Sequence, residues 1–211
     1  MSPKDKVYNF ISEQLTRGNL KRSDHITEQF LSDNLGMSRT PIREALLQLS
    51  SEDILQRVPR KGFVLRSYTR KDVEELYSLI GLLDGKVAEL TCDELTSEDY
   101  AVMKFLVDSM YSAIDNKLYI KYNELQEKFH NVYMQKCQNN LLRTELQNRK
   151  KIFIGKSYIR LDPSSIQSVL KITNNEHQKI IDLFKSHSKE ELRQFLENVH
   201  WNSQNAQYDI W

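Results

Sequence analysis

The segment LGMSRTPIREAL, at residues 35–46, sets the local fold of the first third of the chain. Gly36 suits the left-handed backbone of a tight turn and is predicted to end one helix. Ser38 can cap the next helix, and Pro41 falls in its first turn, where a missing N–H costs little. The helix after the turn then carries one apolar stripe, formed by Ile42, Ala45, Leu46 and Leu49. The segment therefore predicts two helices joined by a short turn.

Both flanks of this segment extend the pattern. Upstream, residues 4–17 predict a first helix, and a second helix that begins near Thr27 leads into the turn. Downstream, residues 54–58 and 63–65 predict two short strands on either side of the sequence PRKG at 59–62. That arrangement predicts a small β-hairpin with a basic tip. The whole region therefore has the pattern of a winged helix-turn-helix.

The rest of the chain has helical periodicity throughout. Residues 160–170, which contain Asp162-Pro163, are expected to be a connecting stretch. Six helices are predicted, at about 70–95, 97–116, 118–137, 139–159, 172–186 and 188–205. The expected fold class is mainly α, with a winged helix-turn-helix domain at residues 1–69 and an antiparallel six-helix bundle at residues 70–211.

Charge and composition narrow the class of function. The 211 residues carry a formal net charge of +1, but residues 54–71 contain six Lys or Arg side chains and no acidic one. This local excess favours nucleic-acid contacts next to the helix-turn-helix. No run approaches the roughly 18 apolar residues of a membrane span, and MSPKDKVYNF lacks the core of a signal peptide, so we expect a cytoplasmic protein without a membrane partner. Cys92 and Cys137 match no metal-binding spacing and are expected to be ordinary buried or half-buried thiols.

The stretch from Ser38 to Leu46 closely resembles the most characteristic segment of the winged helix-turn-helix in the GntR family of bacterial regulators. The helical region that follows resembles the C-terminal domain of the family's FadR-like (FCD) branch, in its shorter VanR-like form. Together the two resemblances cover nearly the whole chain. They imply a DNA-binding transcriptional regulator whose second domain dimerises and binds a small-molecule effector.

The resemblance implies that the helix after Ser38 enters the major groove by its N-terminal end. That end offers N–H donors and a positive dipole to phosphate. Arg39 and Arg43 lie four residues apart on one helix face, and arginine can pair with guanine. The predicted DNA-binding residues are Ser38, Arg39, Thr40, Pro41 and Arg43 in the helix and Arg60, Lys61 and Gly62 in the wing.

Two residues near this face qualify the resemblance. Gln29 stands where many relatives carry an arginine, so one of the family's DNA contacts is expected to be missing here. Glu44 is expected to orient a neighbouring arginine instead of touching DNA. The operator sequence of relatives therefore cannot be carried over to this chain.

The resemblance also implies a site in the second domain. Members of this branch hold a small acid there, and many bind a metal through an Asp-x3-His pair and two later histidines. His130 and His177 match two of those histidines, but Gln126 replaces the aspartate. The apolar stripe of the last helix places Val199 towards the core and turns His200 about 100° away. We therefore expect no tightly bound metal; a divalent metal, if bound, would be held by His130 and His177. The predicted effector pocket is lined by Gln126, His130, His177 and Val199.

The main hypothesis is a homodimeric repressor, not an enzyme, that binds double-stranded DNA at an inverted-repeat operator and responds to a small-molecule effector, for example an organic acid. One alternative is a winged-helix regulator with a degenerate pocket, which acts without an effector or through a protein partner. A helical metal-dependent enzyme is a further alternative. It is disfavoured because the sequence contains no Gly-rich phosphate loop, GxSxG or HExxH pattern.

Overall fold

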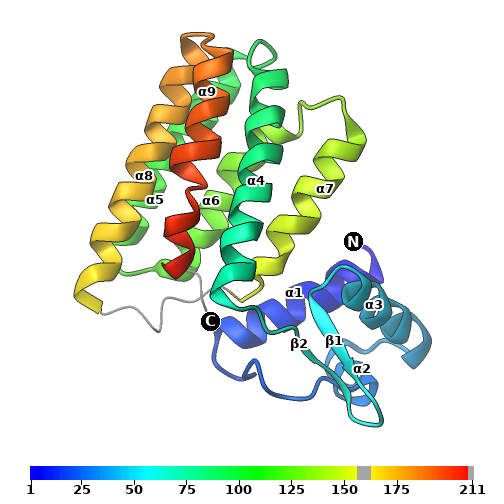
Figure 1. The fold of residues 1–211 in the computed structure, drawn as a ribbon. Helices are drawn as coiled ribbons and strands as arrows, with labels where there is room; N and C mark the ends of the chain where they lie inside the picture. Colours follow the sequence, from blue (N-terminus) through cyan, green and yellow to red (C-terminus); the bar gives the residue numbers. More distant parts are fainter. Residues whose placement is uncertain (156–162, 209–211) are drawn as a thin grey trace. The chain divides into compact units, whose positions relative to one another are not determined.

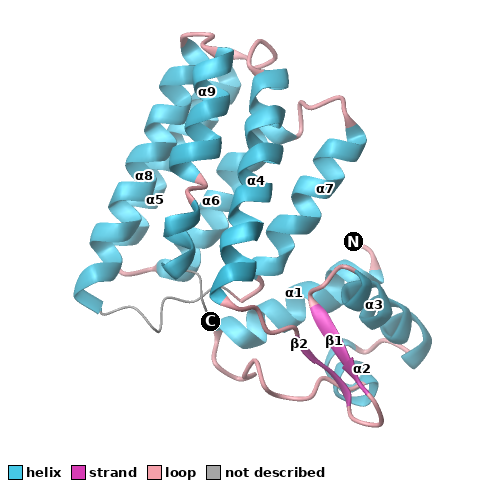
Figure 2. Ribbon diagram, in the orientation of Figure 1, coloured by secondary structure: helices cyan, strands magenta, loops and turns pink. Residues whose placement is uncertain are grey.

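The computed structural model describes residues 1–155 and 163–208, which form two compact units. The first unit comprises Met1–Ser67 together with a short segment that begins at Lys151, and the second unit contains the remaining residues. Figure 1 follows the chain through both units, and Figure 2 shows that helices dominate, with one pair of strands. The expected fold class, mainly helical with one N-terminal hairpin, is confirmed. No helix among the described residues has the length and apolar character that crossing a membrane requires.

The first unit is a helix-turn-helix with a wing. Thr27 caps the second helix, since its side chain accepts a hydrogen bond from the Phe30 backbone N–H at 3.1 Å. Gly36 ends that helix in the left-handed conformation, with φ 63°. Apolar side chains from all three helices are fully buried between them, among them Val7, Ile11, Leu31, Ile42 and Leu46. The elements are α1 (Pro3–Thr16), α2 (Glu28–Leu35), α3 (Arg39–Ser51), β1 (Leu55–Val58) and β2 (Gly62–Leu65).

The wing is an antiparallel hairpin of β1 and β2. The Lys61 backbone N–H closes its turn by donating to the Val58 carbonyl oxygen at 3.1 Å. Gly62 follows the turn with φ +100°, and a Cβ atom at this position would lie 2.5 Å from the Ile26 carbonyl oxygen. The close approach of these two backbones therefore requires glycine.

We expect Gly62→Ala to lower the free energy of unfolding by more than about 1 kcal/mol, because alanine is strained at positive φ and its Cβ would displace the Ile26 backbone. Chemical denaturation followed by circular dichroism measures the loss. Gly18→Ala is the matched control, since Gly18 has φ +74° but a Cβ there meets nothing within 4 Å. Equal losses in the two variants would show that the contact with Ile26 is unimportant.

The second unit is a helical bundle. Helix α4 packs against α6, α7 and α9, while α5 packs against α6 and α8. Reciprocal capping boxes start two of the helices, between Thr69 and Asp72 and between Thr96 and Asp99. The expectation for the cysteines is confirmed, because both are free and buried. The helices are α4 (Arg70–Thr91), α5 (Ser97–Asp115), α6 (Tyr119–Met134), α7 (Asn140–Lys150), α8 (Pro163–Lys185) and α9 (Lys189–Phe195).

Three predicted helix boundaries in this region are wrong. Helix α7 ends at Lys150, where a helix to residue 159 was expected, and a 3-10 turn follows; residues 156–162 lie outside the described part of the chain. Helix α8 begins at Pro163, because proline is well tolerated at the first helical position. The last predicted helix is interrupted, since α9 stops at Phe195 and continues as a π-helical turn, Leu196–His200.

Candidate DNA interface and three-histidine site

The N-terminal end of α3 is exposed. Ser38, Arg39 and Thr40 are all exposed, Pro41 is half-buried, and the Arg43 side chain is 62% exposed one turn later. Ser38 has the extended backbone of an N-cap residue, but its side chain makes no capping hydrogen bond, contrary to the prediction. The first-turn N–H groups of α3 therefore lack that cap and can serve an anion.

Helix α2 orients both arginines of this face. Glu28 accepts two hydrogen bonds from Arg43, at 2.7 Å from Nε and 2.9 Å from Nη2. The Arg43 hydrogen bond is the main reason that the pKa of Glu28 is lowered. Gln29 accepts a hydrogen bond from Arg39. The acid that orients an arginine is thus Glu28, and the expectation for Glu44 is wrong.

The wing presents its basic side chains at the turn. Arg60 and Lys61 are both exposed, and Gly62 is half-buried beside them. Arg57, on β1, is also exposed. The predicted wing residues therefore occupy one hairpin tip, where positive charge can meet the phosphate backbone.

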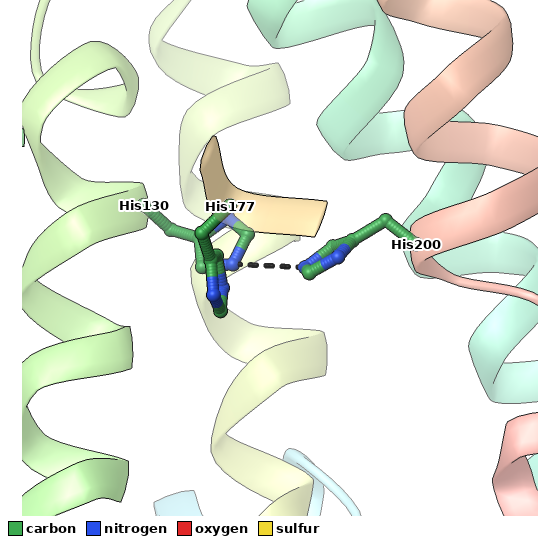
Figure 3. A group of neighbouring side chains, drawn as sticks. All are labelled: His130, His177 and His200. Atoms are coloured by element: carbon green, nitrogen blue, oxygen red, sulfur yellow. Dashed lines mark hydrogen bonds between the residues drawn. The ribbon is translucent and has the colours of Figure 1, made fainter. Parts of the chain in front are cut away.

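In the second unit, three histidines converge from separate elements (Figure 3). His130 comes from α6, His177 from α8 and His200 from the π-helical turn, and all three are buried. Each offers a ring nitrogen, and these nitrogens all lie within 4.8 Å of one another. The Nε2 atoms of His130 and His200 are 3.2 Å apart.

The π-helical turn brings His200 into this group. A π turn contains an extra residue compared with an α turn, so it rotates the side chains that follow. Val199 is consequently 43% exposed, whereas His200 is 5% exposed. The prediction that Val199 faces the core and His200 points away is therefore wrong. Gln126 is half-buried one turn before His130 and remains a predicted pocket residue.

Carboxylates fix the orientation of two of the rings. Glu176 Oε2 lies 2.9 Å from His200 Nδ1. The Tyr133 hydroxyl donates to Asp84 Oδ1 at 2.7 Å, so its oxygen accepts from His130 Nδ1, which lies 2.6 Å away. Both Nδ1 atoms therefore carry hydrogen, and in the neutral His130 ring Nε2 directs its lone pair towards Nε2 of His200.

Asp84, on α4, is the buried carboxylate of this network. Its Oδ2 accepts from the Lys150 ammonium at 3.0 Å and from Trp201 Nε1 at 2.9 Å, and lies 3.2 Å from His130 Nδ1. Burial is the largest influence and would raise the pKa of Asp84, but Lys150, His130 and Tyr133 together hold it well below its usual value. Asp84 is therefore a fixed negative charge beside the histidines.

His177 and His130 are held neutral. Burial, more than any other factor, lowers the pKa of His130 to about 3 and that of His177 well below its usual value. Neither ring nitrogen of His177 has a hydrogen-bond partner among the described residues. Neutral imidazole is the form that binds metals, so both rings are ready to act as ligands.

The donor set fits a divalent transition metal. Two nitrogen ligands about 2.0–2.1 Å from a tetrahedral zinc ion lie roughly 3.3–3.4 Å apart, close to the 3.2 Å between the Nε2 atoms of His130 and His200. Two ring nitrogens that face each other at that distance need a proton or a cation between them. A metal-bound histidine typically gives its other ring nitrogen to a carboxylate or similar acceptor, as His130 and His200 do here. The register of His200 was one of two reasons for expecting no tightly bound metal, and it no longer holds; the other, Gln126 in place of the aspartate, remains.

Several residues of these sites had not been predicted from the sequence. Glu28 lies 15 residues before Arg43, across the turn. Lys150 and Trp201 reach Asp84 over separations of 66 and 117 residues, and no local pattern joins them. Only Glu176 had a signal, because it directly precedes His177.

Taken together, a winged helix with exposed arginines and a helical bundle with a buried polar site define a DNA-binding regulator with a sensing domain. Comparison with known families agrees. Residues 3–65 match the family model described as "Bacterial regulatory proteins, gntR family", and residues 75–199 match the model described as "FCD domain". The chain belongs to the GntR family of transcriptional regulators, in the branch that carries an FCD domain.

Individual relatives support this assignment. The chain is 27% identical over 190 residues to the uncharacterized HTH-type transcriptional regulator YdhC of Bacillus subtilis, covering 90% of this chain and 84% of the relative. It is 24% identical to the gluconate operon transcriptional repressor of Bacillus licheniformis, covering 94% and 82%. The solved structure of Escherichia coli McbR/YncC has a TM-score of 0.80 at 22% identity, covering 99% and 97%. The family models and these relatives are regulators, so the chain is not an enzyme.

Proposed function

We propose that this chain is a repressor that binds an inverted-repeat operator as a homodimer and leaves it when an anionic effector binds through a divalent metal at His130, His177 and His200. One observation carries the sensing part of the proposal. His177 is buried with both ring nitrogens unpartnered among the described residues, next to two inward-facing histidine nitrogens. Leaving such atoms without a partner is costly, and a metal ion would satisfy them.

On the DNA side, the proposal assigns the readout of bases to α3. Arg39 and Arg43 would reach base edges in the major groove, with Ser38 and Thr40 on phosphate. Arg60 and Lys61 would contact the backbone or minor groove from the wing. Because its target would be chromosomal DNA, the protein would act in the cytoplasm.

On the effector side, three histidines would hold the ion through ring nitrogens. A divalent metal in such a site supplies a Lewis acid with open positions for an anion. Because imidazole ligands bring no negative charge and Gln126 stands in place of the aspartate that the family resemblance implies, the three rings leave the charge of the metal uncompensated. An organic acid is the class of effector that this charge favours.

A second copy of the chain is the proposed partner of α4. Leu79, Leu82 and Leu90 lie towards one side of this helix and are 42%, 57% and 47% exposed. Apolar side chains gathered on one face of a helix favour association with another apolar surface. A symmetric dimer would also present two copies of α3 to the two halves of an inverted repeat.

The test is selection of duplexes from a random DNA pool at one fixed, near-physiological salt concentration, with the protein's mass measured by light scattering. Salt must be fixed because phosphate contacts make affinity steeply salt-dependent. The metal-free protein should enrich an inverted repeat as a dimer, and Zn²⁺ together with a mixture of small carboxylic acids should weaken binding to it. A parallel measurement with Zn²⁺ and no acid separates the effect of the metal from that of the acid.

Each alternative has its own outcome. An enriched operator whose binding no metal or acid changes would support the degenerate-pocket hypothesis. A pool without enrichment would favour a winged helix that contacts protein. Enrichment of a single half-site by a monomer would overturn the homodimer.

A further inference from the structure

We infer that Lys150 couples the three-histidine site to the DNA-binding unit, through its ion pair with Asp84 on one side and its peptide bond to Lys151 on the other. This inference rests on the proposed function, because it describes how ligand binding at that site would be transmitted. It concerns two consecutive residues that belong to different compact units.

The first step is the connection from Lys150 to the histidines. The Lys150 side chain is 19% exposed, and its ammonium lies 3.0 Å from Oδ2 of the fully buried Asp84. The same oxygen lies 3.2 Å from Nδ1 of His130. Lys150 is therefore one carboxylate away from a predicted metal ligand. Its ammonium also lies 5.2 Å from the centre of the Trp201 ring, which favours a cation there.

The second step is the connection from Lys151 to the helix-turn-helix unit. The Lys151 carbonyl oxygen accepts a hydrogen bond from the Tyr8 hydroxyl at 3.0 Å, and its ammonium lies 3.5 Å from Asp5. Arg22 donates to the Ile154 carbonyl oxygen at 3.2 Å. Residues 151–155 are thus held to α1 and to the loop that follows it.

Gly155 makes this attachment close. It has φ +63°, and a Cβ atom there would lie 2.6 Å from Cβ of Leu15, on α1. Ile152 and Ile154 are buried, with 4% and 1% exposed. The segment therefore packs as part of the DNA-binding unit and cannot shift without disturbing α1.

The third step is charge. In the metal-free site, the negative charge of Asp84 faces the Lys150 ammonium and the neutral His130. A divalent cation bound by His130 places two further positive charges near the same carboxylate. These charges compete for Asp84 and repel the Lys150 ammonium. Lys150 is then held less firmly, and because consecutive Cα atoms are about 3.8 Å apart, its displacement reaches Lys151 directly.

The test measures coupling, not binding alone. Operator affinity is measured by fluorescence anisotropy in EDTA and in saturating Zn²⁺, and Zn²⁺ affinity by calorimetry, for the wild type and three variants. A coupled pair of sites typically changes affinity by about 5- to 150-fold. Lys150→Met should still bind Zn²⁺ and operator, but its ratio of the two operator affinities should fall to within about twofold of one.

Gly155→Ala tests the other side of the junction. It should leave Zn²⁺ affinity unchanged and reduce the same ratio, because the added Cβ separates the segment from Leu15. Lys121→Gln is the control, since it removes an equal charge from an exposed ion pair with Glu124 and should keep the wild-type ratio.

The outcomes separate the two proposals. A wild-type ratio near one would refute the coupling through Lys150, because a cation at the histidines would then leave operator affinity unchanged, whereas release that needs both metal and acid is decided by the DNA selection with Zn²⁺ and carboxylic acids. A clear wild-type ratio that Lys150→Met and Gly155→Ala both retain would overturn the role of Lys150 and leave the proposed function standing. Loss of the ratio in both variants, with Zn²⁺ still bound, is the expected result.

Discussion

Replacing Arg43 with alanine is expected to weaken binding to the cognate operator by roughly 5- to 150-fold. Arg43 is exposed on α3, one turn after the N-terminal end that would face DNA. A bidentate pair between arginine and guanine is the commonest specific contact in the major groove. Loss of that pair should also relax the preference for one base pair of each half-site.

Glu28 strengthens this expectation. Its carboxylate accepts hydrogen bonds from the Nε–H and from one N–H of Nη2 of Arg43. Three of the five guanidinium N–H groups are therefore left for DNA. The remaining groups lie at the far end of the side chain, where they can meet O6 and N7 of guanine. The ion pair therefore holds Arg43 in one conformation before DNA arrives, which lowers the entropy lost on binding. Glu28→Gln should reduce affinity less than Arg43→Ala.

Titration of labelled duplexes at fixed salt measures both effects. Arg17→Ala is the matched control, because Arg17 is an exposed arginine paired with Glu13 at the end of α1 and is not one of the predicted DNA-binding residues. The wild type and Arg43→Ala are each titrated with the cognate duplex and with a duplex in which the guanine proposed to pair with Arg43 is replaced. An equal loss on the two duplexes would assign Arg43 to phosphate, and no loss would remove it from the interface.

Local rules predicted the first unit well. The turn at Gly36, the start of α3 at Ser38 and the hairpin around residues 59–62 each depend on neighbours within a few residues. The pairing of Arg43 with Glu28 was missed, because it joins residues on both sides of a turn. The expectation had named Glu44, which is next to Arg43 in the sequence, instead.

The histidine site could be predicted only in part. His130 and His177 were found from their resemblance to a motif, but hydrophobic periodicity assumes 3.6 residues per turn and so misplaced Val199 and His200. The π-helical turn breaks that assumption after Phe195. Asp84 and Lys150 meet only because α4 and α7 pack together, a tertiary fact that no local pattern encodes.

His177→Leu should have opposite effects on the metal-free and metal-loaded protein. Without metal, His177 buries two ring nitrogens that lack a hydrogen-bond partner among the described residues, and each such group costs about 1–3 kcal/mol. A leucine of similar size removes that cost and can pack beside Phe129, whose ring centre lies 4.7 Å from that of His177. The variant should therefore unfold at the same or a higher temperature in EDTA.

With Zn²⁺ present, the wild type should unfold at a higher temperature than His177→Leu. A ligand at 100 times its Kd stabilises the folded state by about 2.7 kcal/mol, and a variant that lacks one of three ligands should show almost none of this gain. Thermal unfolding in EDTA measures the stability of the metal-free protein, and the shift in Zn²⁺ measures the stabilisation by the metal. His187→Asn is the control, because His187 is an exposed histidine in a separate group with the buried Cys92 and the exposed Asp93, and asparagine tolerates its positive φ. If His177→Leu instead destabilises the metal-free protein and keeps the Zn²⁺ shift, His177 is an ordinary core residue and Zn²⁺ binds elsewhere.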